Sequence, residues 1–182
     1  MFELHPPAAS GGTWIETVLH CFAGGTDAKA PKAGVIPGEN GELYGTTKLG
    51  GSTGEGIGTV FQMTPPSSPG GKMDRTSPVQ LPIGLPTAGY YPVTPLVMNQ
   101  GGTLFGTTCC GGPVVYGVVF QLTPPASPNG SWSETVLWGF LGGADGGSPY
   151  TGLTFGQGGR LDGTTTGTGV SPYVATVFEV TP

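Results

Sequence analysis

Charge is scarce in this chain. Only six of its 182 residues are Lys or Arg and eleven are Asp or Glu, so charged residues make up 9% of the sequence and the net charge is −5. Proteins bind nucleic acid mainly through clustered cations that neutralise phosphates. Six scattered basic residues do not supply such a cluster, so we predict no nucleic-acid partner.

Long apolar runs are also missing. No stretch approaches the roughly 18 apolar residues that a membrane-spanning helix needs, and no stretch has a helical period of apolar residues. The first residues lack the basic-then-apolar order of a secretion signal. We therefore predict no membrane span, and an export signal, if the protein has one, would lie outside this sequence.

Cysteine is rare, with Cys21, Cys109 and Cys110 as the three copies. Their spacings match neither a tetrahedral metal site nor a disulfide framework. Adjacent cysteines such as Cys109 and Cys110 can join only through a strained ring. The sequence therefore predicts reduced thiols, no structural metal and no cofactor.

Glycine and proline are abundant instead: 36 Gly and 19 Pro make up about 30% of the chain, a level typical of low complexity unless a period is present. A period is present, in three recurring segments. We name them the Trp segment, the Gly-Thr-Thr segment and the Val-Phe segment. The Trp segment lies at 14–19 and 132–137 with a degraded copy at 73–81, the Gly-Thr-Thr segment at 43–47, 104–108 and 161–165, and the Val-Phe segment at 58–66, 117–125 and 175–182.

These segments divide the chain into one repeat domain, 1–182. Residues 2–12 repeat the end of the Val-Phe segment and would be the closing strand of a preceding unit, and they are followed by repeat 1 (13–71), repeat 2 (72–130) and repeat 3 (131–182). Within the Val-Phe segment Phe61 and Met63 alternate with Val60 and Gln62, the period of a pleated strand. The Phe side is apolar in every copy, so we assign it to the space between units. Each repeat is predicted to supply four strands.

Turn residues support the strand assignment. Asn40-Gly41, Gly101-Gly102 and Gly158-Gly159 are typical of two-residue hairpin turns, which need positive φ angles. Proline pairs follow the Val-Phe segments at 65–66 and 124–125 and end them, because proline cannot donate to a β ladder.

The fold class that these patterns predict is all-β, a β-propeller-like array of three four-stranded antiparallel blades plus one N-terminal strand. A closed threefold fold, a β-prism or β-trefoil, is the alternative. Propellers usually close with about four to eight blades, and an open three-blade arc would expose the apolar faces of its end blades. We therefore predict a homodimer or higher homo-oligomer that completes the propeller.

The order Glu-Thr-Val-Leu-His-x-Phe-x-Gly-Gly-x-Asp from Glu16, then Gly-x-Leu-Tyr-Gly-Thr-Thr, then Gly-Thr-Val-Phe-x-x-Thr-Pro resembles the GloVer repeat of choice-of-anchor tandem-repeat proteins over residues 2–182. The resemblance implies a propeller-like array in a bacterial surface or secreted protein. It carries no catalytic residue set. The chain departs from the pattern at 73–86, which lacks the Trp and the Gly-Gly-x-Asp loop, and at Asp162, where an aromatic residue is expected.

Six residues are candidates for binding. The recurring threonines Thr47, Thr108 and Thr165 would line a channel or a polar end if their hydroxyls were exposed, although Thr is also a good strand former. Trp14 and Trp132 could stack on sugars, or pack the blades. Asp162 breaks the repeat where the other copies carry Tyr44 and Phe105, and it could equally be part of a surface charge arrangement with Arg160.

Asp27 and Asp145 are weak metal candidates, because each lies in a Gly-rich loop that could offer oxygens to Ca²⁺. Calcium needs six to eight oxygen ligands, and Asp also stabilises turns by bonding its own backbone. The two histidines, His5 and His20, occupy positions where other copies carry Thr or Trp, and no Gly-x-Ser-x-Gly motif is present. We predict no catalytic residue.

The function predicted from the sequence is a non-enzymatic extracellular or surface propeller module, either a scaffold or a binder of a glycan, small ligand or protein. The alternative is a hydrolase or lyase with an atypical site in the propeller channel, since a fold does not fix a function. Convergence of Asp27, Asp145 or Asp162 with a histidine in one pocket would favour the alternative.

Overall fold

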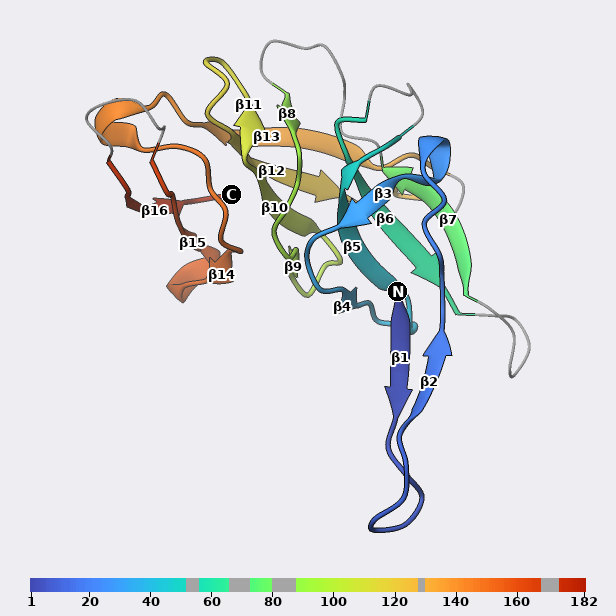
Figure 1. The fold of residues 1–182 in the computed structure, drawn as a ribbon. Helices are drawn as coiled ribbons and strands as arrows, with labels where there is room; N and C mark the ends of the chain where they lie inside the picture. Colours follow the sequence, from blue (N-terminus) through green and yellow to red (C-terminus); the bar gives the residue numbers. More distant parts are fainter. Residues whose placement is uncertain (52–55, 66–72, 80–87, 128–129, 168–173) are drawn as a thin grey trace.

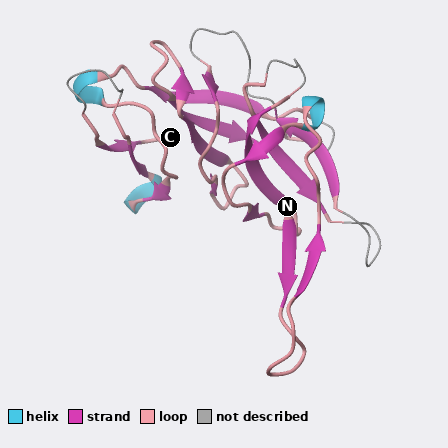
Figure 2. Cartoon of the chain, viewed as in Figure 1, coloured by secondary structure: helices cyan, strands magenta, loops and turns pink. Residues whose placement is uncertain are grey.

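The computed structural model describes residues 1–51, 56–65, 73–79, 88–127, 130–167 and 174–182. Its fold is all-β, built from several small antiparallel sheets (Figures 1 and 2). The helical segments among these residues are three short 3₁₀ turns: η1 (Gly25–Asp27), η2 (Gly143–Asp145) and η3 (Gln157–Gly159). Within the described ranges no helix has the length and apolar character that crossing a bilayer requires.

Three sheets follow one another along the chain, and we call them sheets 1, 2 and 3. Sheet 1 contains β3 (Lys29–Pro31), β4 (Ile36–Pro37), β5 (Leu43–Leu49), β6 (Thr59–Thr64) and β7 (Asp74–Val79). Sheet 2 contains β9 (Val97–Met98), β10 (Leu104–Thr108), β12 (Val118–Thr123) and β13 (Ser133–Gly139), with the short pair β8 (Gly89–Tyr90) and β11 (Cys110–Gly111) beside it. Sheet 3 contains β14 (Thr154–Phe155), β15 (Leu161–Thr164) and β16 (Val177–Val180).

A fourth, separate hairpin opens the chain. It is made of β1 (Phe2–His5) and β2 (Ile15–Val18), and we call it the arm. Figure 1 shows the arm extending away from the three sheets, which lie side by side in chain order. The described residues form neither a closed ring nor the closed threefold fold predicted as the alternative.

Sheets 1 and 2 are each assembled from two sequence repeats, whereas the three strands of sheet 3 all come from repeat 3. The Val-Phe segment of repeat 1 forms β6 and pairs with β7 of repeat 2, and that of repeat 2 forms β12 and pairs with β13 of repeat 3. The Gly-Thr-Thr segments form β5, β10 and β15 and pair with the other edge of the Val-Phe strands. The degraded Trp segment of repeat 2 still forms a strand over Asp74–Val79, and its residues 80–81 lie outside the described part.

The apolar side predicted for the Val-Phe strand is buried in β6 and β12, at Phe61, Met63, Phe120 and Leu122, whereas Phe178 and Val180 are half-buried and Phe2 and Leu4 are exposed. In β6 and β12 the opposite side is buried as well, at Val60 and Val119, because another sheet stacks on it. Alternate residues of β12 enter two cores. Core 1, between sheets 1 and 2, contains Tyr44, Val60, Leu96, Leu104, Val118, Phe120 and Leu122. Core 2, between sheets 2 and 3, contains Phe105, Val119, Phe140, Leu153 and Leu161, with Phe178 packed against it.

The hairpins between the inner strands form where the Gly-containing turns were predicted, and Gly41, Gly102 and Gly159 have positive φ angles. The prediction of two-residue turns is wrong. The closing hydrogen bonds run from the Gly38 amide to the Glu42 carbonyl and from the Asn99 amide to the Thr103 carbonyl, so three residues lie between the paired ends. A side chain supplies the reason in the second turn: the Asn99 carboxamide oxygen accepts hydrogen bonds from the Gly101 and Thr103 amides, at 3.0 Å each.

Candidate functional site

The recurring threonines lie inside the sheets. Thr47 and Thr108 are fully buried and Thr165 nearly so. The Thr47 and Thr59 hydroxyl oxygens are 2.8 Å apart across β5 and β6, and those of Thr165 and Thr176 are 2.9 Å apart. The Thr108 hydroxyl oxygen accepts a hydrogen bond from the Val118 amide of β12 at 3.2 Å, and the hydroxyl donates to the Cys110 carbonyl at 2.9 Å. These hydroxyls are therefore engaged in hydrogen bonds that join strands.

Trp14 and Trp132 occupy equivalent positions in different surroundings. Trp132 packs against core 1, with its ring centroid 5.9 Å from that of Tyr44 in an edge-on arrangement. Trp14 precedes β2 on the arm and is 61% exposed. Of the two, Trp14 is the side chain with surface available to stack on a ligand.

The Asp27 and Asp145 loops have the same construction. An Asp27 carboxylate oxygen accepts a hydrogen bond from the Ala23 amide at 2.6 Å, and an Asp145 oxygen accepts one from the Leu141 amide at 2.7 Å. Each aspartate thus bonds the backbone four residues before it and closes its own Gly-rich turn. Within the described residues no group of three or more His, Cys, Asp or Glu side chains gathers as metal ligands would.

His20 is the histidine that meets an aspartate. Its Nε2 lies 3.0 Å from Asp27 Oδ1, and its ring packs edge-on against Phe22 at 4.8 Å between centroids. The aspartate equivalent to Asp27, Asp145, makes its turn without a histidine, because Trp138 stands at the His20 position. The histidine therefore adds to a turn that the aspartate already forms. His5 lies on the arm, 3.4 Å from Glu3.

Cys109 and Cys110 are free thiols whose sulfur atoms lie 3.0 Å apart. Burial, together with the hydrogen bond and charge of Cys109, raises the pKa of Cys110 to about 12. A hydrogen bond to Cys109 and the charge of that thiolate raise the pKa of Tyr150 to about 12. Cys109 itself is almost fully buried.

Asp162 lies on the face of sheet 3 that points away from sheet 2. It pairs across the strands with Glu179, and Glu179 holds the Arg160 guanidinium at 2.8 Å. The surface charge arrangement predicted at this point is thus built mainly by Arg160 and Glu179. The equivalent residues Tyr44 and Phe105 are buried in cores 1 and 2, so Asp162 makes the outer face polar where inner faces are aromatic.

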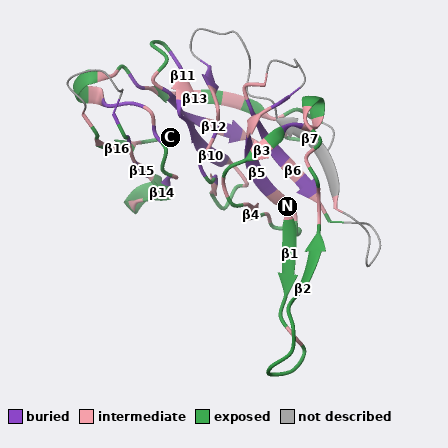
Figure 3. Cartoon of the chain, in the orientation of Figure 1, coloured by how far each residue is buried: buried purple, intermediate pink, exposed green. Residues whose placement is uncertain are grey.

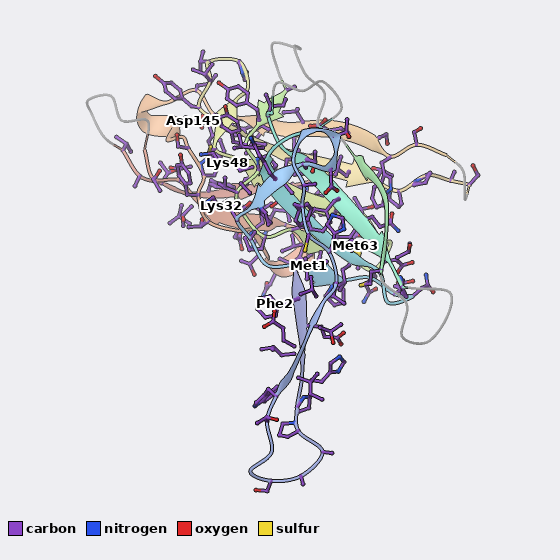
Figure 4. The ribbon with its side chains drawn as sticks, turned by 45° about the vertical axis from the view of Figure 1, so that its right-hand side comes forward. Met1, Phe2, Lys32, Lys48, Met63 and Asp145 are labelled. Atoms are coloured by element: carbon purple, nitrogen blue, oxygen red, sulfur yellow. The ribbon has the colours of Figure 1, made fainter. Side chains whose placement is uncertain are left out.

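The opposite end of the row of three sheets is apolar. We call this surface the front face of sheet 1. Phe61 and Met63 are buried there, and Phe22 packs on Phe61 with ring centroids 5.2 Å apart. A pocket of about 250 Å³ opens on this face, lined by Met1, Phe2, Phe22, Pro31, Ala33, Gly34, Val35 and Phe61. Figure 4 shows Met1 and Phe2 where the arm joins the sheets. A second, more open pocket of about 570 Å³ lies between Met98 and Phe155.

The pocket on the front face was not predicted. The signal that could have found it is the equivalence of Phe22 with Phe140, 118 residues apart in matching loops. Phe140 packs on Phe178 at 5.0 Å, as Phe22 packs on Phe61. The sequence shows this match, but it does not show that a pocket opens beside Phe22 and Phe61.

A family model described as the Gloeobacter/Verrucomicrobia repeat matches residues 2–181. No curated protein and no solved structure matches the chain.

Proposed function

This chain belongs to the Gloeobacter/Verrucomicrobia repeat family, and we propose that its sheets are blades of a propeller-like array acting as a non-enzymatic scaffold or binding module. The observation that supports this proposal is the stacking of equivalent sheets through aromatic cores. Sheet 2 buries both faces, whereas the arm leaves apolar side chains exposed and a pocket opens on the front face of sheet 1. Large uncovered apolar surfaces usually mark interaction sites.

The partner that we propose is a second copy of the chain, in a homodimer or higher homo-oligomer that covers these apolar faces. Three blades are fewer than the four to eight with which propellers usually close. The arm alone exposes Phe2, Leu4, Trp14, Ile15 and Val18. A glycan or protein ligand bound over Trp14 is the second kind of partner within the same proposal.

We place the module outside the cell or on its surface, as the resemblance to surface and secreted repeat proteins implies. Fractionation of the native organism, with protease treatment of whole cells, tests this location. Recovery of the protein in the cytosolic fraction, protected from the protease, would contradict it.

The hydrolase or lyase alternative has one observation in its favour, the contact between His20 and Asp27. Asp27 also accepts a hydrogen bond from the Ala23 amide. Neither His20 nor Asp27 lines the two pockets described above. General base catalysis needs a base within hydrogen-bond reach of a substrate. We therefore favour the binding module.

Size-exclusion chromatography with light scattering tests the association. We expect a mass of about twice the 18.3 kDa of one chain or more. The double variant Phe2→Ser, Leu4→Ser should shift the mass towards the monomer, because it removes apolar surface from the arm. Val177→Ser is the matched control, since Val177 is 83% exposed on the polar end of the row. A monomer at all concentrations, or equal effects of both changes, would contradict the proposal.

A further inference from the structure

The arm has the same strand register as an internal part of sheet 2. In β12–β13, Phe120 pairs with Val136 and Leu122 with Glu134. In the arm, Phe2 pairs with Val18 and Leu4 with Glu16, which are the equivalent residues. The arm is therefore the outer half of a sheet of this family.

The two hairpins differ in what covers them. Phe120 and Leu122 are completely buried, whereas Phe2 is 59% exposed and Leu4 is 50% exposed. Figure 3 shows the arm exposed along its length while β10 and β12 are buried. Burial of a Phe or Leu side chain stabilises a protein, and the arm retains apolar surface that its counterpart has buried.

β10 pairs with the inner edge of β12, and a glycine in β10 leaves room for the ring of Phe120. Gly106 lies opposite Phe120, and a Cβ on Gly106 would lie only 2.6 Å from the tip of the Phe120 ring. The ring therefore lies over the glycine. The same arrangement recurs for Gly45 with Phe61 and for Gly163 with Phe178. Among the described residues β1 pairs only with β2, so its inner edge is open.

The pocket on the front face of sheet 1 corresponds to a space in core 2 that a side chain fills. Four of its lining residues, Met1, Phe22, Val35 and Phe61, are equivalent to Val119, Phe140, Leu153 and Phe178 around core 2. In core 2 these side chains surround Phe105, the aromatic residue before Gly106. On the front face no described side chain takes the place of Phe105, and the pocket lies there.

We propose that the inner edge of β1 binds a Leu-aromatic-Gly-Thr-Thr strand of a further repeat unit. Its glycine lies opposite Phe2, and its aromatic side chain fills the pocket between Phe22 and Phe61. This inference rests on the proposed interaction role. The occupant is a further unit rather than a folded second copy, because β5, β10 and β15 are each already paired on both edges.

A graft tests the pairing within the full chain. Residues 88–118, which carry β8 to β11, are placed directly before Met1, so that Val118 is followed by Met1 as it is normally followed by the equivalent Val119. We expect amide exchange in β1 to slow at least tenfold, and nuclear Overhauser contacts between the grafted copy of Phe105 and the ring of Phe61. The thermal midpoint should rise by several degrees.

Two changes confined to the graft serve as controls. Gly106→Val in the grafted copy should abolish the protection of β1, because a side chain there collides with Phe2. Phe105→Ala in the grafted copy should keep most of the protection while losing the midpoint rise. Equal exchange with and without Gly106→Val, or a grafted Phe105 without contacts to Phe61, would overturn the inference.

Light scattering on the ungrafted chain separates this inference from the proposed homo-oligomer. If the ungrafted chain is monomeric and the graft still protects β1, the homo-oligomer fails and the strand pairing stands. If β1 is already protected in an oligomer of the ungrafted chain and the graft adds nothing, a second copy is the occupant and the inference is overturned.

Discussion

Gly106 lies beneath the ring of Phe120, its partner across the strands β10 and β12. A Cβ on Gly106 would lie 2.6 Å from Phe120 Cζ and 2.9 Å from Leu96 Cδ2. The flat ring covers the bare backbone of the neighbouring strand, an arrangement that gives a strand glycine the packing it lacks. This relationship explains why the Gly-Thr-Thr and Val-Phe segments recur together in the repeat.

Replacement of Gly106 by valine should destabilise the protein by about 2 kcal/mol, because overpacking forces Phe120 and Leu96 out of place. Urea denaturation measures the change. Gly101→Ala is the matched control: Gly101 is exposed, and a Cβ there would come no nearer than 3.4 Å to Asn99 Oδ1. Equal stability of the two variants would show that the packing of the Phe120 ring does not depend on a glycine at position 106.

Glu134 should make stability depend on pH. Burial raises the pKa of its carboxyl to about 7 from 4.5, and neither carboxylate oxygen has a hydrogen-bond partner among the described residues. The folded protein therefore holds this proton more tightly than the unfolded chain does. The stability that this proton contributes is complete below about pH 4.5 and is lost as the pH rises through 7, by about 3 kcal/mol in all.

Glu134→Gln should remove most of this loss between pH 5 and pH 8 in denaturation experiments. Glu16→Gln is the control, because Glu16 holds the equivalent position on the exposed arm. A Glu134→Gln profile that follows the unmodified protein would contradict the assignment.

The Thr47–Thr59 hydroxyl pair should show an energetic coupling. Thr47→Val leaves the Thr59 hydroxyl without the partner that lies 2.8 Å away, at a cost of about 1 kcal/mol. The double change to valine should cost less than the two single changes added together. A double-mutant cycle in urea measures the difference, and strict additivity would show that the hydroxyls do not interact.

Asp145 should stabilise its loop without calcium. Asp145→Ala removes the acceptor of the Leu141 amide and should cost about 1 kcal/mol. Thermal melts of the unmodified protein should be identical in Ca²⁺ and in chelator. A midpoint that rises with Ca²⁺, and no longer does so in Asp145→Ala, would support the metal interpretation instead.

The strands were largely predictable because each segment carries its own local signals. Alternation in the Val-Phe segment, proline at its end and positive-φ glycines in the hairpins predicted β6, β12 and the turns before β5 and β10. The predicted loop length was wrong because the Asn99 side chain accepts hydrogen bonds from backbone amides two and four residues ahead. Turn rules based on dipeptides do not include this side-chain effect. The partner of each Trp segment was also not evident, since pairing across repeats depends on distant contacts.

The residues of the candidate site were less predictable, because their burial also depends on contacts between distant parts of the chain. Thr47 and Trp14 each belong to recurring segments, yet Thr47 is buried and Trp14 is exposed. The sequence by itself determined the repeat and the strands, because these follow from local geometry and from the period. Only the tertiary structure decided which copies are covered, because burial depends on whether a neighbouring sheet stacks on that face.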